Sequence, residues 1–267
     1  MGRECEYAVE ILRLAANKDQ LLEAIYRPNR NPGLSDQSLG SIEVRGWGAA
    51  MQTMPISAPL TLLRFTPDGS ALLEAEQVPS GGEQVYLVRP GKDRAPLVAV
   101  PGHITRLSWR SDSSAVVIHS IQGERLALTL MRLAPSVIAA VVADLDATGY
   151  ARSLVPLTWD DAGLLWVAPD NAGDSTLWSA PLNTLIPGRK GPLDARALTR
   201  LADGTLRVVT VQGSSVVIGR YQGEIFIGET TVPRVQAAPD LIGIWQGSEL
   251  LVQGGGHAWL LNRIYLD

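Results

Sequence analysis

A phrase that returns roughly every 44 residues constrains the fold of this chain more than any other feature of its sequence. In its clearest copy, Phe65 is followed by the polar turn Thr66-Pro67-Asp68-Gly69-Ser70 and then by a new apolar run. The apolar residues that open the copies, here called anchors, are Leu14, Phe65, Trp109, Trp159, Leu201 and Trp245. Successive anchors lie 51, 44, 50, 42 and 44 residues apart, which is close to the length of one four-stranded propeller blade.

The stretches between the anchors have the pattern of β-strands. Apolar runs and the turns between them place strands at residues 84–89, 126–132, 175–181, 208–211, 215–220 and 224–228. Asp-Gly and its Asp-Ser, Asn-Lys and Gln-Gly substitutes suit hairpin tips, where a positive φ is needed. Residues 135–146 have some helical character, because Ser136 suits a helix N-cap before an apolar run. For this segment a strand is nevertheless favoured over a helix.

These patterns predict an all-β chain: a β-propeller of about six blades, each a four-stranded antiparallel sheet, forming a single domain over residues 1–267. After Trp245 only two clear strands follow, near residues 250–253 and 258–265, so the last blade is short of strands. Either the N-terminal strands complete that blade and close the ring, or the ring is incomplete and the chain is a segment of a longer protein. Residues 25–60 fit the repeat worst.

Composition and charge exclude several classes of protein. The chain has 23 basic and 27 acidic residues, a net charge of −4 and no basic block, which argues against nucleic acid as the main partner. The single cysteine, Cys5, excludes a disulfide scaffold. No apolar run is long enough to span a membrane, and no signal peptide opens the sequence. We therefore expect either a cytoplasmic protein or one whose export segment lies outside this chain.

No motif for catalysis, cofactor binding or metal binding stands out. His103, His119 and His257 share no ligand spacing, and there is no Gly-x-Ser-x-Gly nucleophile elbow. The segment Asp170–Asp174 has the polar residues of a calcium loop but lacks its distal glutamate, so we predict a hairpin turn there. No catalytic, cofactor-binding or metal-binding residue is therefore predicted, and a binding protein is favoured over an enzyme.

The arginines near the anchors are the main candidates for a binding site. Arg64, Arg106 and Arg200 lie one to three residues before an anchor, and His103 precedes the expected inner strand 104–107. At the mouth of a propeller channel these side chains would bind a carboxylate or an acidic peptide. Alternatively, the arginines cover blade edges and pair with nearby acids, and His103 bonds to a backbone carbonyl.

The phrase Phe65–Ser70, with its echoes at Trp109 and Trp159, resembles the propeller repeats of TolB-like proteins. Within that group the whole chain looks like the β-propeller domain of LpqB-type actinobacterial lipoproteins. The resemblance implies a non-enzymatic, exported protein. LpqB-type members act with a sensor kinase at the cell surface, and TolB binds other envelope proteins. This chain lacks the lipoprotein signal and the other lipoprotein domains, so the resemblance leaves its localisation and its partner undecided.

We therefore expect a monomeric protein-interaction module with a protein partner and without a cofactor. Two other classes stay open. An enzyme-associated propeller would hold a lactonase-like metal site in its channel or would gate a serine peptidase. A sugar-binding propeller would expose aromatic side chains at one rim, whereas Trp47, Trp166, Trp178 and Trp259 are expected to pack inside.

Overall fold

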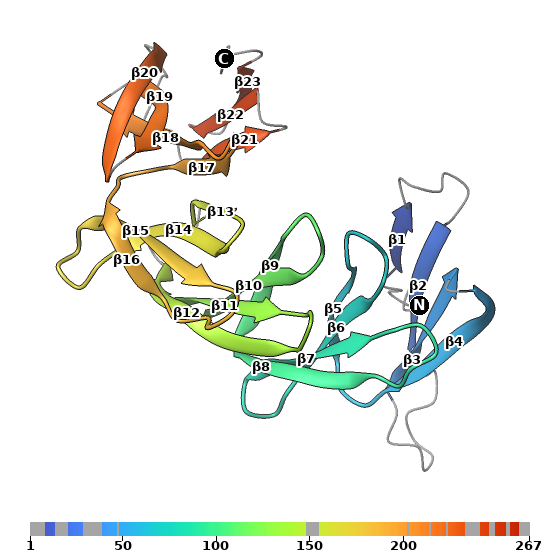
Figure 1. Cartoon of the computed structure of the whole chain (residues 1–267). Helices are drawn as coiled ribbons and strands as arrows, with labels where there is room; N and C mark the ends of the chain where they lie inside the picture. Colours follow the sequence, from blue (N-terminus) through green and yellow to red (C-terminus); the bar gives the residue numbers. More distant parts are fainter. Residues whose placement is uncertain are drawn as a thin grey trace. The chain divides into compact units, whose positions relative to one another are not determined.

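The computed structural model describes residues 9–13, 21–28, 39–46, 48–147, 155–201, 203–213, 215–222, 224–232, 241–245, 249–254 and 257–261. Within these ranges the regular structure consists of 23 β-strands, and no α-helix occurs. The strands form six sheets, and within each sheet every strand pairs with its neighbours in chain order (Figure 1). No helix of the described residues could span a membrane.

The first three sheets consist of β1 (Val9–Arg13), β2 (Leu21–Pro28), β3 (Gly40–Gly46) and β4 (Gly48–Ile56); β5 (Leu60–Phe65), β6 (Leu72–Gln77), β7 (Gly82–Val88) and β8 (Ala95–Pro101); and β9 (His103–Trp109), β10 (Ala115–Gln122), β11 (Arg125–Arg132) and β12 (Ile138–Asp146). The next three consist of β13 (Leu157–Trp159), β14 (Gly163–Pro169), β15 (Ser175–Pro181) and β16 (Gly188–Pro192); β17 (Ala197–Arg200), β18 (Leu206–Gln212), β19 (Ser215–Gln222) and β20 (Ile225–Val232); and β21 (Leu241–Trp245), β22 (Glu249–Gly254) and β23 (His257–Leu261).

These six successive sheets confirm the predicted all-β, propeller-type fold. Five sheets have four strands, and the last has three among the described residues. The N-terminal strands β1 to β4 make up the first sheet themselves. Residues 25–60, which fit the repeat worst, hold regular strands, and residues 138–146 form a strand, as favoured over a helix.

The contacts between residues divide the chain into two compact units, each described here by itself. Unit 1 comprises residues 1–123 and 127–141, and unit 2 comprises residues 124–126 and 142–267. In unit 1, the first strand β1 lies against the first strand β5; in unit 2, β17 lies against both β13 and β21. First strands of successive sheets thus meet, as the inner strands of propeller blades do. The prediction of a single domain stays a prediction.

The core lies between the faces of successive sheets. In unit 1, Leu73, Val85, Val116 and Ile118 belong to one cluster of buried apolar side chains, and Ile42 belongs to a second. In unit 2, apolar residues of β14, β15 and β18 form a third cluster. The middle strands carry continuous apolar runs, such as Ala-Val-Val-Ile at the start of β10, because they are buried on both faces. The outer strand β8 is more exposed.

In the copies whose turns the structure describes, the repeated phrase forms the turn between the first and second strands of a sheet. In three copies an Asp side chain accepts a hydrogen bond from the backbone N–H two residues later: Asp68 from Ser70, Asp112 from Ser114, and Asp203 from Thr205. Such Asx turns replace part of the backbone hydrogen bonding at a tight corner. The expected hairpin tips are therefore confirmed at these copies, whereas Leu14 lies outside the described residues.

Candidate functional site

Of the four predicted site residues, three lie in unit 1 and one lies in unit 2. Arg64 lies on β5, and His103 and Arg106 lie on β9, all in unit 1. Arg200 is the last residue of β17, in unit 2. The shared role of these residues at one channel mouth stays a prediction.

His103 is held by a buried carboxylate. Its Nδ1 lies 2.6 Å from Oε1 of Glu83 on β7; the His103 side chain is 68% exposed, and that of Glu83 is 3% exposed. This partner differs from the backbone carbonyl considered as the alternative for His103. Arg64 is exposed and donates through Nη1 to the carbonyl of its strand neighbour Leu63 over 2.9 Å.

Arg106 stands opposite a buried histidine. It faces His119 in the pairing of β9 with β10, and the Ser108 hydroxyl lies 3.2 Å from Nε2 of His119. Burial, together with the positive charge of Arg106, lowers the pKa of His119 to about 4. His119 is therefore neutral at physiological pH. A neutral, buried ring with a hydroxyl neighbour is part of the core, so His119 is not placed in the candidate site.

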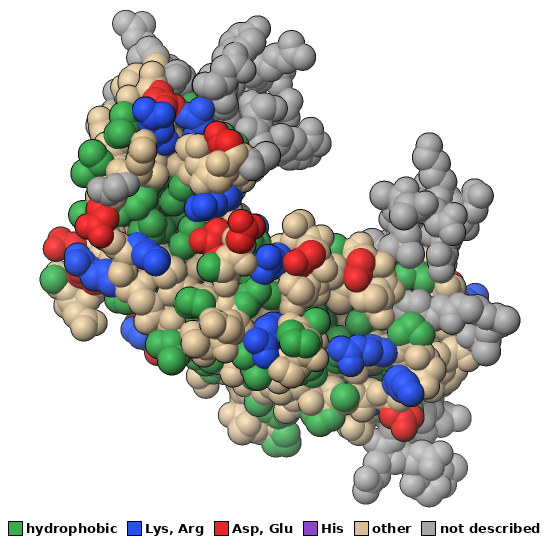
Figure 2. Space-filling model, viewed as in Figure 1, with side chains coloured by type: hydrophobic (Ala, Val, Ile, Leu, Met, Phe, Trp, Pro, Cys, Tyr) green, Lys and Arg blue, Asp and Glu red, His purple; other side chains and the backbone are tan. Residues whose placement is uncertain are grey.

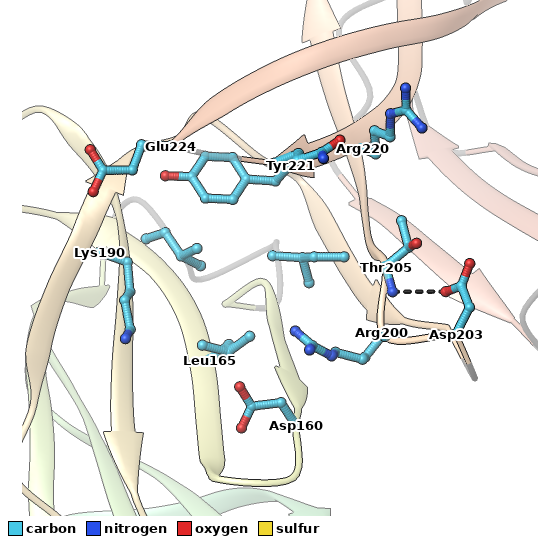
Figure 3. A pocket seen from close by; sticks show the side chains of 13 residues that line it. Asp160, Leu165, Lys190, Arg200, Asp203, Thr205, Arg220, Tyr221 and Glu224 are labelled. Carbon is cyan, nitrogen blue, oxygen red and sulfur yellow. Dashed lines mark hydrogen bonds between the residues drawn. The ribbon is translucent and has the colours of Figure 1, made fainter.

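A pocket of about 710 Å³ lies within unit 2 and includes one predicted site residue, Arg200. The charged and aromatic side chains that line it are Asp160, Lys190, Arg200, Asp203, Arg220, Tyr221 and Glu224 (Figure 3). Leu165, Leu177 and Leu206 also line it, and all three are buried. The pocket thus combines charged side chains with apolar ones in its lining. Its volume is within the range of ligand pockets in proteins.

Two of the acids in this pocket already have backbone partners. Asp160 accepts a hydrogen bond from the N–H of Gly163 over 2.7 Å, and Asp203 accepts one from the N–H of Thr205 over 2.8 Å. The bond from Thr205 holds the pKa of Asp203 below its usual value. Both carboxylates therefore stabilise their own turns, and part of their hydrogen-bonding capacity is used there.

The cations of the pocket differ in their partners. Arg220 pairs with Glu229 across 3.4 Å. The arginine–carboxylate pairs among the described residues of unit 2 are Arg125–Asp144, Arg189–Asp170, Arg207–Glu229 and Arg220–Glu229. The side chains of Arg200 and Lys190 take part in none of the ion pairs or hydrogen bonds found among the described residues of unit 2. These two cations are consequently available to a ligand.

Tyr221 closes one side of the pocket. A Cβ on Gly191 of β16 would lie 2.5 Å from the Tyr221 hydroxyl oxygen, so this glycine leaves the space that the phenol occupies. The hydroxyl is buried and has no hydrogen-bond partner among the described residues. Burial and the charge of Glu224 raise the pKa of Tyr221. The phenol is therefore a neutral donor whose hydrogen bond is unmade.

Sequence reasoning found Arg200 but missed Lys190, Tyr221 and Glu224. Arg200 was found because it directly precedes the anchor Leu201. Lys190 lies on the fourth strand of its sheet, and Tyr221 and Glu224 lie around the turn between β19 and β20. The repeat phrase covers neither place, and only the packing of one sheet beside the next brings these residues together.

The Asp170–Asp174 segment is a turn, as predicted. Asp170 accepts hydrogen bonds from the N–H groups of Ala172 and Asp174, and Gly173 has a φ of 86°. Trp166 is buried and stacks on Trp178 with ring centroids 6.4 Å apart, which confirms the packing role expected for these two. The side chains of Trp47 and Trp259 lie outside the described residues.

The surface charge is mixed. On the face shown in Figure 2, Lys and Arg side chains are interspersed with Asp and Glu, and no large field of one sign appears. This agrees with the net charge of −4. The pocket in unit 2 follows the same pattern, because both cations and anions line it.

Comparisons with known proteins give structural neighbours only. No protein-family model matches the chain, and no curated protein matches it. Among solved structures, the chain is similar to TolB from Acinetobacter baumannii, with 14% identity and a TM-score of 0.43 over 90% of this chain and 59% of that one. It is also similar to the β-propeller domain of the Trilobed protease from Pyrococcus furiosus, with 11% identity and a TM-score of 0.48 over 90% of this chain and 77% of that one. The chain thus spans 59% of the length of the TolB chain.

Proposed function

We propose that this chain is a non-enzymatic protein-interaction module whose binding surface includes the pocket of unit 2. The observation that carries the proposal is the pair of cations, Arg200 and Lys190, that line this pocket without an ion pair to any described residue. Charged groups without partners at a surface are suited to recognition, because they favour a complementary partner and disfavour others.

The lining of the pocket supports a polar protein segment as the ligand. Pockets for small apolar ligands are lined mainly by apolar and aromatic side chains with a few polar groups. Here the three leucines of the lining, Leu165, Leu177 and Leu206, are almost fully buried, and the other lining side chains include five charged residues besides Arg200. Charged side chains near strand ends and hairpin turns are typical of the rim of a protein–protein interface.

A partner in the cell envelope belongs to the proposal. The phrase Phe65–Ser70 resembles the propeller repeats of TolB-like proteins, and within that group the whole chain looks like the β-propeller domain of LpqB-type lipoproteins. This resemblance supports a surface-exposed partner such as a sensor kinase. Fractionation of the source cells, with an antibody to the chain, tests this part. We expect to detect the chain in the envelope fraction. Detection in the cytosol alone would contradict a partner in the cell envelope.

The binding function is tested by selecting peptides on the purified full chain. A random 12-residue library displayed on phage provides the probe, and selected peptides are then synthesised with a fluorescent label. We expect saturable binding by fluorescence anisotropy, with the peptides recovered unchanged after incubation. Failure to select any saturable peptide, or cleavage of the peptides, would contradict a non-enzymatic interaction module.

A further inference from the structure

We infer that the pocket of unit 2 binds one carboxylate side chain, an Asp or Glu in an extended segment of the partner, between Arg200 and Lys190. This inference rests on the proposed interaction function and specifies its ligand. It depends on three features of the pocket: which charges are already satisfied, how the two cations are held, and what limits the charge of the ligand.

The first feature is the difference between the acids and the cations. Asp160 and Asp203 each accept a backbone hydrogen bond, at 2.7 and 2.8 Å, and so belong to their own turns. Arg200 and Lys190 have no such partner among the described residues. A ligand that supplies an anion therefore gains charge-assisted hydrogen bonds without breaking an existing ion pair.

The second feature is the way in which the pocket positions Arg200. Arg200 pairs with Leu206 at the end of the β17–β18 ladder, next to the turn that contains Gly204. A Cβ on Gly204, where φ is +85°, would lie 3.6 Å from Nη2 of Arg200, so the guanidinium passes close over this turn. Figure 3 shows Arg200 extending from there into the pocket, toward the side that carries Lys190. A guanidinium in this position offers two parallel N–H groups, which suit the two oxygens of a carboxylate.

Lys190 approaches the pocket from another sheet. It lies on β16, beside Gly191, and β16 is held by its pairing with β15. An ammonium from β16 and a guanidinium from β17 thus line the same pocket of unit 2. Two cations on separate backbone supports provide a site for one anion between them, because neither can approach the other closely without electrostatic cost.

The third feature limits the ligand to a single negative charge. Glu224 also lines the pocket and has no hydrogen-bond or ion-pair partner among the described residues. A second acid on the ligand would face Glu224, Asp160 or Asp203, and like charges at close range repel. The pocket therefore favours one acidic side chain flanked by uncharged residues over a polyacidic stretch.

The experiment uses the peptides selected on the full chain and follows both sides of the contact. Each selected peptide is compared with a version in which its acid is replaced by the corresponding amide, Glu by Gln or Asp by Asn. Binding to the chain and to the variants Arg200→Gln and Lys190→Gln is measured by fluorescence anisotropy. Arg196→Gln serves as the matched control, because Arg196 is an exposed arginine of unit 2 outside the pocket. Thermal melting confirms that each variant is folded.

We expect the selected peptides to share one acidic position. Arg200→Gln should weaken the acidic peptide roughly tenfold or more and its amide version less than about twofold, which is the coupling expected of a direct charge contact. Arg196→Gln should leave both unchanged. Peptides that bind without a shared acid, or that are weakened equally by Arg200→Gln in both versions, would overturn this inference and leave the interaction function standing. If no peptide binds at all, the interaction function fails, and this inference fails with it.

Discussion

The backbone N–H of Asp68 donates a hydrogen bond of 3.1 Å to the side-chain oxygen of Ser113. Both residues lie in unit 1, in corresponding turns of the second and third sheets. Ser113 occupies the place that Gly69 and Gly204 hold in their copies of the phrase, and it adopts the same left-handed backbone, with a φ of 60°. The Ser113 backbone is therefore strained at a position that favours glycine, and its side chain links two neighbouring sheets.

The first prediction separates these two effects. Ser113→Ala loses the hydrogen bond and keeps the strain, so we expect it to lower the free energy of unfolding by about 1 kcal/mol. Ser113→Gly loses the bond but relieves a strain of similar size, so its stability should stay close to that of the parent chain. Urea unfolding, followed by tryptophan fluorescence, measures both. A Ser113→Gly variant that is about 1 kcal/mol more stable than the parent would show that the bond to Asp68 contributes nothing.

The second prediction concerns Glu74, a buried acid on β6. Its Oε1 lies 2.9 Å from Nε of Arg94, yet neither carboxylate oxygen accepts a hydrogen bond from the part of the chain that the structure describes. Burial raises the pKa of Glu74 to about 7; Arg94 opposes this rise, and the nearby Glu76 adds to it. The folded state therefore binds this proton more tightly than the unfolded chain does. The resulting stability is complete below the ordinary pKa of 4.5 and is lost as the pH rises through about 7.

The change Glu74→Gln removes this titration. Relative to the parent chain, the variant should gain roughly 3 kcal/mol in unfolding free energy between pH 4.5 and pH 8, because only the parent incurs the ionisation cost. Denaturant unfolding at half-unit pH steps measures the difference. The exposed Glu124→Gln provides the control and should show no such trend. An equal pH dependence in Glu74→Gln and the parent would refute the assignment.

The third prediction has the opposite sign. Burial and the charge of Arg106 lower the pKa of His119 to about 4, from an ordinary value of 6.5. The unfolded chain therefore binds this proton more tightly, so the stability that depends on neutral His119 is present above pH 6.5 and lost as the pH falls through about 4. Relative to the parent, His119→Gln should gain roughly 3 kcal/mol as the pH falls through this window.

The two titrations oppose each other between pH 4.5 and 6.5. We expect a shallow pH dependence in the parent chain over this window, since the loss at Glu74 and the gain at His119 nearly cancel. The double variant Glu74→Gln/His119→Gln should also be nearly flat, whereas each single variant should slope in its own direction. Single variants that slope in the same direction would contradict one of the two pKa directions, namely that of the group whose predicted slope is reversed.

The parts of this fold that were predictable are those encoded locally. The phrase around Asp68 and Asp112 specifies an Asx turn through contacts that span only two residues, so the repeat located its hairpin tips correctly. Residues 25–60 fit worst because their strands carry no such phrase, and a register shift between Val44 and Gly46 disturbs the alternation.

The site was less predictable because its contacts join distant segments. Arg200 could be found from its position before an anchor, but the partner of His103 could not. Glu83 reaches His103 because the pairing of β7 with β8 brings Gly82 opposite Pro101, two residues before the histidine. Lys190 and Tyr221 likewise meet only through the packing of β16 beside the β19–β20 hairpin. No short sequence pattern predicts these contacts.

The last prediction concerns the unmade hydrogen bond of Tyr221. Its hydroxyl is buried and has no partner among the described residues, and a buried donor without a partner costs free energy. Tyr221→Phe keeps the ring beside Gly191 and removes only the hydroxyl. We therefore expect the free energy of unfolding to rise by about 1 kcal/mol, measured by urea unfolding.

A matched tyrosine distinguishes this effect from a general gain on losing a hydroxyl. Tyr26 donates its hydroxyl hydrogen to the carbonyl of Leu39, at 3.4 Å, so Tyr26→Phe should leave stability unchanged or slightly reduced.

Gly191→Ala tests the contact between Gly191 and Tyr221 from the other side, because the new Cβ would lie 2.5 Å from the Tyr221 oxygen and the phenol must shift. In the Tyr221→Phe variant, Gly191→Ala should lower the free energy of unfolding by less, because the oxygen that the new Cβ would meet is absent. An equal cost of Gly191→Ala in both backgrounds would show that Tyr221 does not fill this space.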